Sequence, residues 1–221
     1  MNILITAGGT REYIDGVRYI GNCSSGQTGA QLADHLDALG HQVTWLGARC
    51  AIEPGSPVAK AHYETFDELS QQLQSLLSEQ CFDLVFQAAA VSDFKVAAVV
   101  LDGEKYEAGR GVKLPTADEV ELQLTKQPKL VSAIKDWSAN PDITVVAFKL
   151  TNSNDSKIRQ LAVDKLLNQS AAIDWVAHND LNEFCANEHG FCLHQLDQEV
   201  TSCADVMAMA DAVLARLEVA A

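Results

Sequence analysis

The chain has 221 residues, 48% of them apolar, which is enough to bury one sizeable hydrophobic core. Aspartate and glutamate number 30 against 16 lysines and arginines, and the net charge of −14 disfavours nucleic acids and anionic membranes as partners. A small phosphorylated substrate can still bind where basic side chains, backbone amides and a divalent cation gather, because net charge governs only long-range approach. Composition therefore leaves small-molecule chemistry open.

The six cysteines form no C-x-x-C pair, and several lie in apolar runs where a thiol behaves as a small hydrophobe. The opening residues 1–6 are too short and too strand-like for a signal peptide, and no apolar run reaches membrane-spanning length. We therefore expect reduced thiols and a cytoplasmic protein without a membrane partner.

Short apolar runs alternate with helical periods along the chain. Gly40 stands where the first helix should end, and Thr65 and Glu68 have the spacing of a capping box that opens the second helix. The alternation predicts a single α/β domain over 1–221, with a doubly wound, mostly parallel, Rossmann-like sheet and helices on both faces. The expected strands are 3–5, 43–46, 84–86, 144–148 and 175–177, and the expected helices are 26–39, 65–77, 129–137, 155–167 and 204–217.

Two stretches interrupt this alternation. Residues 95–118 contain three glycines and mixed charges and are too long for an ordinary connection, so we expect a functional or disordered strap loop. In residues 182–200, Phe191, Leu193 and Leu196 alternate with other residues, which predicts an antiparallel hairpin before the last helix.

Residues 6–29 leave the first strand, form a long loop and enter a helix at Ser24-Ser25-Gly26. Free amides at a helix N-terminus, with small residues and hydroxyls beside them, suit a phosphate or a carboxylate. An ordinary serine cap explains the same residues equally well. The position after the first strand of a doubly wound sheet favours the binding interpretation, because ligands bind at the carboxyl ends of such strands.

A dinucleotide fingerprint is the obvious rival interpretation of this loop. Glycines 21, 26 and 29 do not have the G-x-G-x-x-G spacing, and the chain contains no Walker G-K-[ST] motif. An NAD(P)-dependent reductase therefore stays a weaker alternative, beside a non-catalytic nucleotide-binding protein with the same fold.

Five motifs follow one another in order along the chain, and such an ordered set is far more specific than any single motif. They are ITAGGTREYIDGVRYIGNCSSGQTG (5–29), QAAAVSDF (87–94), KLPTADEVELQLTKQP (113–128), VAFKL (146–150) and VAHNDL (176–181). Together they resemble the phosphopantothenoylcysteine synthetases, the phosphopantothenate–cysteine ligases. The Phe-Lys-Leu version, with no preceding flavin-binding decarboxylase domain, is most similar to the stand-alone bacterial branch, which implies that no FMN is bound.

The resemblance implies a two-step ligation in coenzyme A biosynthesis. The partners would be 4'-phosphopantothenate, L-cysteine and CTP with Mg²⁺ carried mainly on the triphosphate, whereas eukaryotic relatives favour ATP. The family also implies a homodimer, with the stretch after Phe94 as a candidate contact. Association with a separate phosphopantothenoylcysteine decarboxylase stays open.

The resemblance assigns catalysis to Arg18, Asn22 and Lys113. Arg18 and Asn22 would serve the acyl intermediate, where an Asn amide can donate to an oxygen that gains charge. Lys113 would reach the nucleotide from a mobile strap that closes over the site. Without the motifs, a surface cation is the simpler interpretation of Arg18 and Lys113, and a turn residue that of Asn22.

The family also implies a set of nucleotide- and substrate-binding residues. Small side chains after the third strand would let a nucleotide lie against the backbone, although helix–sheet packing also explains them. Lys129 stands where the fused enzymes carry an acidic residue, and Asn168 lies near the place of a second triphosphate-binding lysine. The set is Gly8, Gly9, Thr10, Ser24, Ser25, Gly26, Ala88, Ala89, Ala90, Asp93, Pro128, Lys129, Leu130, Val131, Phe148 and Lys165.

Two further groups invite a chemical interpretation. Cys185, His189, Cys192 and His194 are competent zinc ligands, but their spacing fits no standard zinc motif, so we do not predict a metal centre there. Cys23 has no histidine in its motif, and the implied reaction needs no enzyme thiol, so we expect it to pack near the site.

Overall fold

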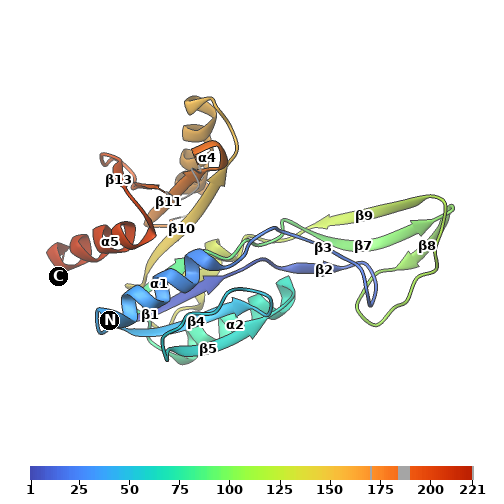
Figure 1. The fold of residues 1–221 in the computed structure, drawn as a ribbon, viewed down its shortest axis with the longest axis horizontal. Coiled ribbons are helices and arrows are strands. Elements are labelled where there is room, and N and C mark those ends of the chain that lie inside the picture. Colours follow the sequence, from blue (N-terminus) through green and yellow to red (C-terminus); the bar gives the residue numbers. More distant parts are fainter. Residues whose placement is uncertain (170, 184–189, 221) are drawn as a thin grey trace.

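The computed structural model describes residues 1–169, 171–183 and 190–220 (Figure 1). Its body is one eight-stranded sheet whose first six strands in the spatial order β5-β4-β1-β6-β10-β11 pair in parallel. Two antiparallel strands complete the edge, which confirms both the doubly wound sheet and the C-terminal hairpin. The strands are β1 (Asn2–Ala7), β4 (Gln42–Ala48), β5 (Ala59–Tyr63), β6 (Leu84–Gln87), β10 (Thr144–Thr151), β11 (Trp175–Asp180), β12 (Phe191–His194) and β13 (Thr201–Cys203).

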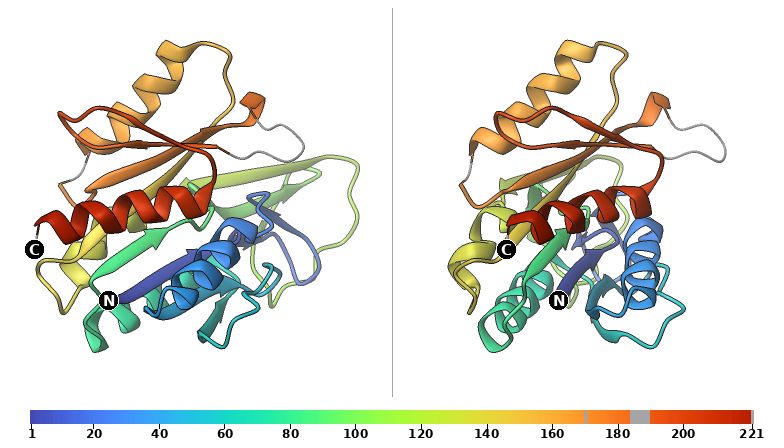
Figure 2. Two further views of the ribbon diagram at one scale, coloured as in Figure 1. Left: turned by 60° about the vertical axis from the view of Figure 1, so that its left-hand side comes forward. Right: turned by 90° about the vertical axis from the view of Figure 1, so that its left-hand side faces the viewer.

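Helices cover both faces of the sheet, as the right-hand view of Figure 2 shows. α1 and α5 pack on one face, and α2, α3 and α4 pack on the other. The expected helix over 129–137 is divided into a 3₁₀ turn and one α-helical turn. The helices are α1 (Gln27–Ala38), α2 (Phe66–Glu79), η1 (Leu130–Ala133), α3 (Ile134–Trp137), α4 (Ser156–Gln169), η2 (Leu181–Glu183) and α5 (Val206–Ala220).

Strand β1 shows why these apolar runs form central strands. Ile3 and Ile5 pack toward α1 and α5, whereas Leu4 packs toward α2, and all three are fully buried. A strand covered on both faces needs an unbroken apolar run rather than an alternating one. Because β4 lies on one side of β1 and β6 on the other, the chain reverses its winding direction between β1 and β6, which is where doubly wound sheets bind ligands.

A β arm projects from the body at this point (Figure 1). The expectation of a strap loop over 95–118 was wrong for its first half, because β7 and β8 form a hairpin there, whereas 108–119 contains neither helix nor strand. Its turn is Asp102-Gly103, with φ of 49° and 85°, and Asp-Gly is a favoured pair for a two-residue hairpin turn. The arm strands are β2 (Arg11–Tyr13), β3 (Tyr19–Gly21), β7 (Phe94–Leu101), β8 (Glu104–Glu107) and β9 (Val120–Lys126).

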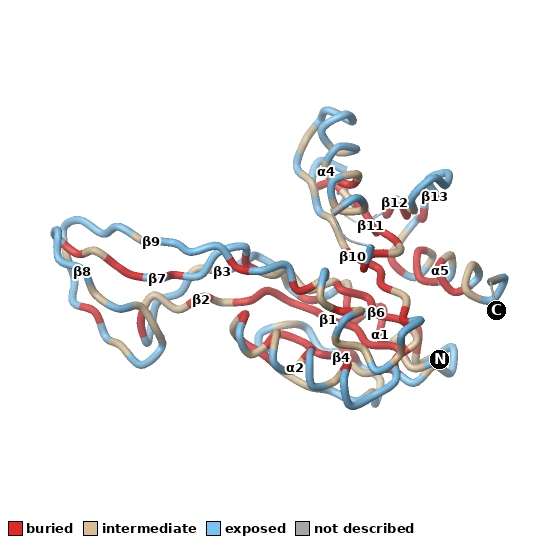
Figure 3. The backbone as a smooth tube through the Cα atoms, turned by 180° about the vertical axis from the view of Figure 1, so that it is seen from behind, coloured by how far each residue is buried: buried red, intermediate tan, exposed pale blue. Residues whose placement is uncertain are grey.

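The arm has a small apolar core of its own. Val96, Val99, Leu101 and Leu114 are buried in it, whereas β9 is exposed along almost its whole length (Figure 3). The arm therefore holds its shape with far less buried surface than the body.

The predicted capping box at α2 is half formed. The Thr65 hydroxyl accepts a hydrogen bond from the N–H of Glu68, but the Glu68 carboxylate accepts from the N–H of Glu64 instead of that of Thr65. Among the helices of the described ranges, none combines the length and the apolar character that crossing a membrane requires.

Candidate functional site

A cleft of about 610 Å³ opens at the carboxyl ends of β1, β6 and β10. The loops after these strands and the N-terminus of α1 line it, so segments far apart in the sequence meet there. Fourteen of the nineteen residues predicted from the motifs contribute to its wall, namely Gly8, Asn22, Ser24, Ser25, Gly26, Ala88, Ala89, Ala90, Asp93, Pro128, Lys129, Leu130, Val131 and Phe148.

The N-terminus of α1 supplies an anion-binding end to the cleft. Gly26 precedes the helix with φ 78°, and a Cβ there would lie 2.5 Å from the Cβ of Ala51, so glycine is needed on both counts. Within the described chain, the N–H groups of Thr28 and Gly29 in the first turn have no hydrogen-bond partner. No acidic residue lies in this turn, so the helix dipole is free to attract a phosphate or a carboxylate.

Asn22 lies at the mouth of this end, directly after β3. Its Nδ2 donates to the carbonyl of Val91 at 3.3 Å, which turns the amide toward the loop after β6. Gly9 packs against the backbone here, since a Cβ on Gly9 would lie 2.3 Å from the carbonyl oxygen of Asn22. The close approach of Gly9 therefore holds the Asn22 loop against the end of β1.

The loop after β6 continues the sheet pairing past the strand ends. The N–H of Ala90 donates to the carbonyl of Gly8 at 2.8 Å, and the N–H of Thr10 donates to the carbonyl of Ala90 at 3.2 Å. The buried Thr10 hydroxyl accepts from the N–H of Ser92 at 2.9 Å. Thr10 and Gly9 thus support the cleft wall from behind without lining it.

Asp93 and Lys129 face each other across the cleft and form an ion pair and hydrogen bond. Both side chains are more than half exposed, so a bound anion or cation can separate them. The carboxylate that the motif was expected to offer to a ligand is therefore engaged by Lys129.

Apolar residues form the opposite end of the cleft. Phe148, in the second half of β10, packs edge-on against Phe191 with ring centroids 5.8 Å apart. Leu130 and Val131 of η1 extend this apolar wall from the other face of the sheet. Such a wall suits a planar ring, whereas the α1 end suits an anion.

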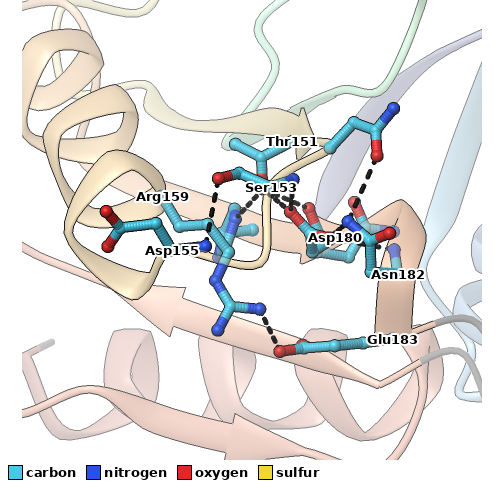
Figure 4. A network of polar contacts seen from close by, with 10 residues as sticks. Thr151, Ser153, Asp155, Arg159, Asp180, Asn182 and Glu183 are labelled. Atoms are coloured by element: carbon cyan, nitrogen blue, oxygen red, sulfur yellow. Dashed lines mark hydrogen bonds and ion pairs between the residues drawn. The ribbon is translucent and has the colours of Figure 1, made fainter.

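A polar network behind this wall holds the loop between β10 and α4 (Figure 4). Asp180 is fully buried and accepts hydrogen bonds from the Thr151 hydroxyl, the N–H of Ser153 at 3.1 Å and the N–H of Asn182 at 2.9 Å. Burial alone would raise the pKa of Asp180, but these donors outweigh it, so the pKa lies well below its usual range. Arg159 and Glu183 form an ion pair that joins α4 to η2.

Three more predicted residues lie outside the cleft wall. Lys165 is exposed on α4, although its neighbour Leu166 lines the cleft. Arg18 and Lys113 lie on the arm, where Lys113 is exposed. Within a single copy of the chain, Arg18 and Lys113 therefore do not contribute to the cleft wall.

Arg18 is held by Asp15 and by the segment that carries Lys113. Its Nη2 lies 2.6 Å from Oδ2 of Asp15 and 3.3 Å from the carbonyl of Leu114. The hydrogen bond from Arg18, with those from backbone N–H groups, keeps the pKa of Asp15 well below its usual range. Asp15 and the carbonyl of Leu114 therefore hold the Arg18 guanidinium in one orientation.

The motifs did not single out several cleft residues. Lys149 lies next to Phe148 in the second half of β10, and Asn179 lies near the carboxyl end of β11, so their position in the parallel sheet was a usable signal. Gln87 gave only a weaker signal, a polar residue that ends a buried strand. The other unpredicted lining residues are Cys23, Gln27, Thr28, Gly29, Val91, Ser92, Ala147, Leu150, Leu166 and Phe191.

The cysteines gave mixed results. Cys23 lies in the cleft wall, which confirms its expected position near the site, but it is exposed, so the expectation that it packs there was wrong. Cys185 and His189 lie outside the described residues. Across 1–169, 171–183 and 190–220, no group of three or more His, Cys, Asp or Glu side chains is arranged to hold a metal ion.

Comparisons with known proteins agree with this geometry. The family of the DNA/pantothenate metabolism flavoprotein C-terminal domain matches residues 1–218. The coenzyme A biosynthesis bifunctional protein CoaBC of Thermococcus kodakarensis is 32% identical over 188 residues, which cover 85% of this chain and 43% of that protein. CoaBC of Escherichia coli K12 is 29% identical over 183 residues, which cover 83% and 42%. The chain thus spans about two-fifths of the length of these relatives.

Solved structures share the whole fold. The DNA/pantothenate metabolism flavoprotein from Streptococcus pneumoniae superposes with a TM-score of 0.84 at 24% identity, over all of both chains. A Cab2 mutant in complex with phosphopantothenate-cysteine superposes with a TM-score of 0.73 at 18% identity, over 97% of this chain and 85% of that one. The chain therefore belongs to the family of the DNA/pantothenate metabolism flavoprotein C-terminal domain, which confirms the family resemblance of its five motifs.

Proposed function

We propose that the chain is a ligase that joins L-cysteine to 4'-phosphopantothenate in coenzyme A biosynthesis, with CTP as the favoured nucleotide. The cleft carries this proposal, because it combines an anion-binding helix terminus with an apolar wall. The relatives named as coenzyme A biosynthesis proteins support the pathway, and the phosphopantothenate-cysteine complex of the Cab2 mutant supports the product.

The reaction has two steps. The carboxylate oxygen of phosphopantothenate attacks the α-phosphorus of the nucleotide, and the bond to the β-phosphate oxygen breaks to release pyrophosphate. The cysteine amine then attacks the acyl carbon, loses a proton to solvent, and displaces the nucleoside monophosphate. Both steps depend mainly on positioning and on stabilisation of developing negative charge.

The residues of this chain supply that positioning. The N–H groups of Thr28 and Gly29 would hold a phosphate or the carboxylate at the α1 terminus. The Asn22 amide, exposed beside them, would donate to the acyl oxygen when it gains charge in the second step. Phe148 and the η1 residues would pack against the base and exclude water from it.

Mg²⁺ fits this cleft only as a companion of the triphosphate. Asp93 is a carboxylate in the cleft wall, and no larger cluster of acidic ligands accompanies it within the described chain. When bound, the ion would neutralise charge on the phosphate oxygens, and Asp93 would contribute to its site after leaving Lys129. The donor set therefore matches an ion that arrives with the nucleotide.

We also propose a homodimer formed through the arm. Three large apolar side chains of the arm are about half exposed, namely Phe94 of β7 and Val120 and Leu124 of β9. Exposed apolar side chains on a β-sheet favour association with another chain. Arg18 and Lys113 lie on this arm, so association of two copies is a route by which they would approach a cleft.

A pyrophosphate-release assay tests the ligase. Purified chain with 4'-phosphopantothenate, Mg²⁺ and CTP or ATP should make phosphopantothenoylcysteine only when cysteine is present. Continuous release of pyrophosphate should also require cysteine, because without it the reaction stops after one pyrophosphate per site. Asn22→Ala should lower product formation by about a hundredfold or more and leave nucleotide affinity largely intact. Asn154→Ala, an exposed asparagine in the loop before α4 and outside the cleft wall, is the matched control and should retain activity. Absence of cysteine-dependent product with both nucleotides contradicts the proposal.

A further inference from the structure

Gln87 is a buried polar residue of the cleft that the proposed mechanism does not use. It ends β6 and lies in register with Thr6 of β1 and Ala147 of β10. Only 6% of the residue is exposed, yet it contributes to the cleft wall. Its place in the middle of the sheet is therefore fixed.

The carboxamide of Gln87 lacks hydrogen-bond partners. Neither Nε2 nor Oε1 is bonded to any group of the described chain, and both atoms are shielded from solvent. The hydroxyl of the adjacent Thr6 already accepts from the N–H of Ala89 at 3.1 Å. An unpaired buried donor and acceptor destabilise a folded protein, and such groups are rare. The packing of Gln87 alone therefore does not account for a carboxamide at this position.

The position of Gln87 separates it from the other unpaired buried atoms of the described chain. Trp45 Nε1, Trp175 Nε1 and His194 Nε2 do not belong to the cleft wall. Glu64 Oε2 faces Arg110 Nη1 at 3.1 Å. Among these groups, Gln87 is the one that borders a space in which a ligand can supply its partners.

The surroundings indicate which part of a ligand Gln87 would meet. Because β6 lies between β1 and β10, Gln87 separates the α1 end of the cleft from the Phe148 end. Gln87 shares a sheet face with Val85, on which Leu130 and Val131 of η1 add apolar surface. A planar group with apolar faces and a hydrogen-bonding edge fits there, and a carboxamide presents donor and acceptor together, as side-chain amides do toward base edges.

We propose that Gln87 binds the hydrogen-bonding edge of the nucleobase and helps to determine which nucleotide the chain uses. This role rests on the proposed ligase function, and it adds a specificity-determining residue to that site. The terminal torsion of a glutamine is broad, so the carboxamide can turn from its enclosed position toward the cleft. The base then provides the donor and the acceptor that the empty protein lacks.

Gln87→Met is the principal test, with binding measured by calorimetry. Affinity for CTP should fall about threefold to tenfold, the range for one hydrogen bond, while affinity for 4'-phosphopantothenate stays unchanged. The melting temperature of the ligand-free variant should equal or exceed that of the wild type, because an apolar side chain of similar shape removes the unpaired amide. A purely structural role predicts the opposite, lower stability with unchanged affinity.

Gln72→Met is the matched control. The Gln72 amide donates to the carbonyl of His62, away from the cleft, so this change should lower the melting temperature and leave CTP affinity as it was. Gln87→Glu, which only accepts hydrogen bonds when ionised, should shift the ratio of CTP to UTP affinity by about threefold or more toward CTP, whose base carries an exocyclic amine.

Three results overturn the role of Gln87: unchanged CTP affinity in Gln87→Met, loss of phosphopantothenate affinity instead, or an unchanged CTP-to-UTP ratio in Gln87→Glu. If the wild type is an active ligase and one of them occurs, only this inference fails. If the wild type neither binds a nucleotide nor makes product, the proposed function fails with it.

A measurement on the unaltered residue covers the case in which Gln87→Met does not fold. With ¹⁵N-labelled glutamine in a Gln27→Ala background, which removes the other cleft glutamine, CTP should shift one side-chain amide signal. Phosphopantothenate should not shift it, and an amide spectrum unchanged by CTP overturns the inference.

Discussion

The body and the arm are built from strands with opposite exposure. All four residues of β6 are buried, whereas six of the seven residues of β9 are exposed (Figure 3). The body thus carries enough buried surface to hold the cleft in place by itself. The arm has one small apolar core and an exposed outer strand, so its geometry depends on its attachment and on whatever covers it.

Charged residues attach the arm to the body. Glu64, which precedes α2, accepts a hydrogen bond from the Tyr13 hydroxyl at 2.6 Å and lies within 3.3 Å of Arg11 and 3.1 Å of Arg110. The guanidinium of Arg11 stacks over Tyr19 at 4.4 Å from the ring centroid. The two regions are therefore held by different forces, apolar burial in the body and polar contacts at the base of the arm.

The largest expected effect tests the dependence of the body on burial. Phe86→Ala removes a fully buried ring from β6 and should lower the free energy of unfolding by about 3–5 kcal/mol, measured by urea denaturation. Leu124→Ala on β9, where the side chain is 47% exposed, is the control and should change the free energy by less than about 0.5 kcal/mol. Equal losses in the two variants would contradict the division into body and arm.

The second prediction concerns the outer surface of the arm. Val120→Asp combined with Leu124→Asp places two charges on β9 and should convert the proposed dimer into a monomer, measured by light scattering, with little change in the melting temperature of the body. Leu161→Asp on α4, a similarly exposed apolar position of the body, should leave the dimer intact. A wild type that is already monomeric contradicts the proposed association.

The same contrast accounts for how much of the fold the sequence predicted. Buried central strands such as β1 and β6 were found because a short, unbroken apolar run between turn residues is typical of a strand that is covered on both faces. β9 lies inside a recognised motif but was not predicted as a strand, although Val120, Leu122 and Leu124 alternate with polar residues and gave a usable signal. The Asp102-Gly103 turn was a usable signal for the β7–β8 hairpin that the mixed charges obscured.

The site divides in a similar way. Residues carried by the motifs mostly meet in the cleft, because motif order fixed which strand ends they follow. The pairing of Asp93 with Lys129 and the isolation of Gln87 depend on three-dimensional neighbours, so no sequence pattern could reveal them. The positions of Arg18 and Lys113 outside the cleft likewise follow from the projection of the arm.

The third prediction uses the buried carboxylate of Asp15, in the turn between β2 and β3 of the arm. Asp15 has a pKa well below its usual range, so its ionised form stabilises the folded state at neutral pH. This contribution is complete above the unfolded value of about 4 and is lost as the pH falls below it toward the folded value. Asp15→Asn should therefore speed amide hydrogen exchange in β2 and β3 at pH 7 and have less effect near pH 2.5. Exchange in β6 serves as the internal control, and an increase there equal to that in the arm would contradict a local role.

The smallest expected effect compares two exposed Lys–Asp pairs, one in the cleft and one between the arm and the body. Lys129 pairs with Asp93, and Lys95 of β7 pairs with Asp67 of α2 at 3.4 Å. Either lysine-to-alanine change should alter the free energy of unfolding by less than about 1 kcal/mol, because exposed ion pairs contribute little. Lys129→Ala should also weaken CTP binding by about twofold to fivefold, and this difference should shrink as the salt concentration rises. Lys95→Ala should leave CTP affinity unchanged, because neither Lys95 nor Asp67 belongs to the cleft wall. Equal losses of affinity in the two variants would show that the net charge of the protein, rather than the cleft, attracts the nucleotide.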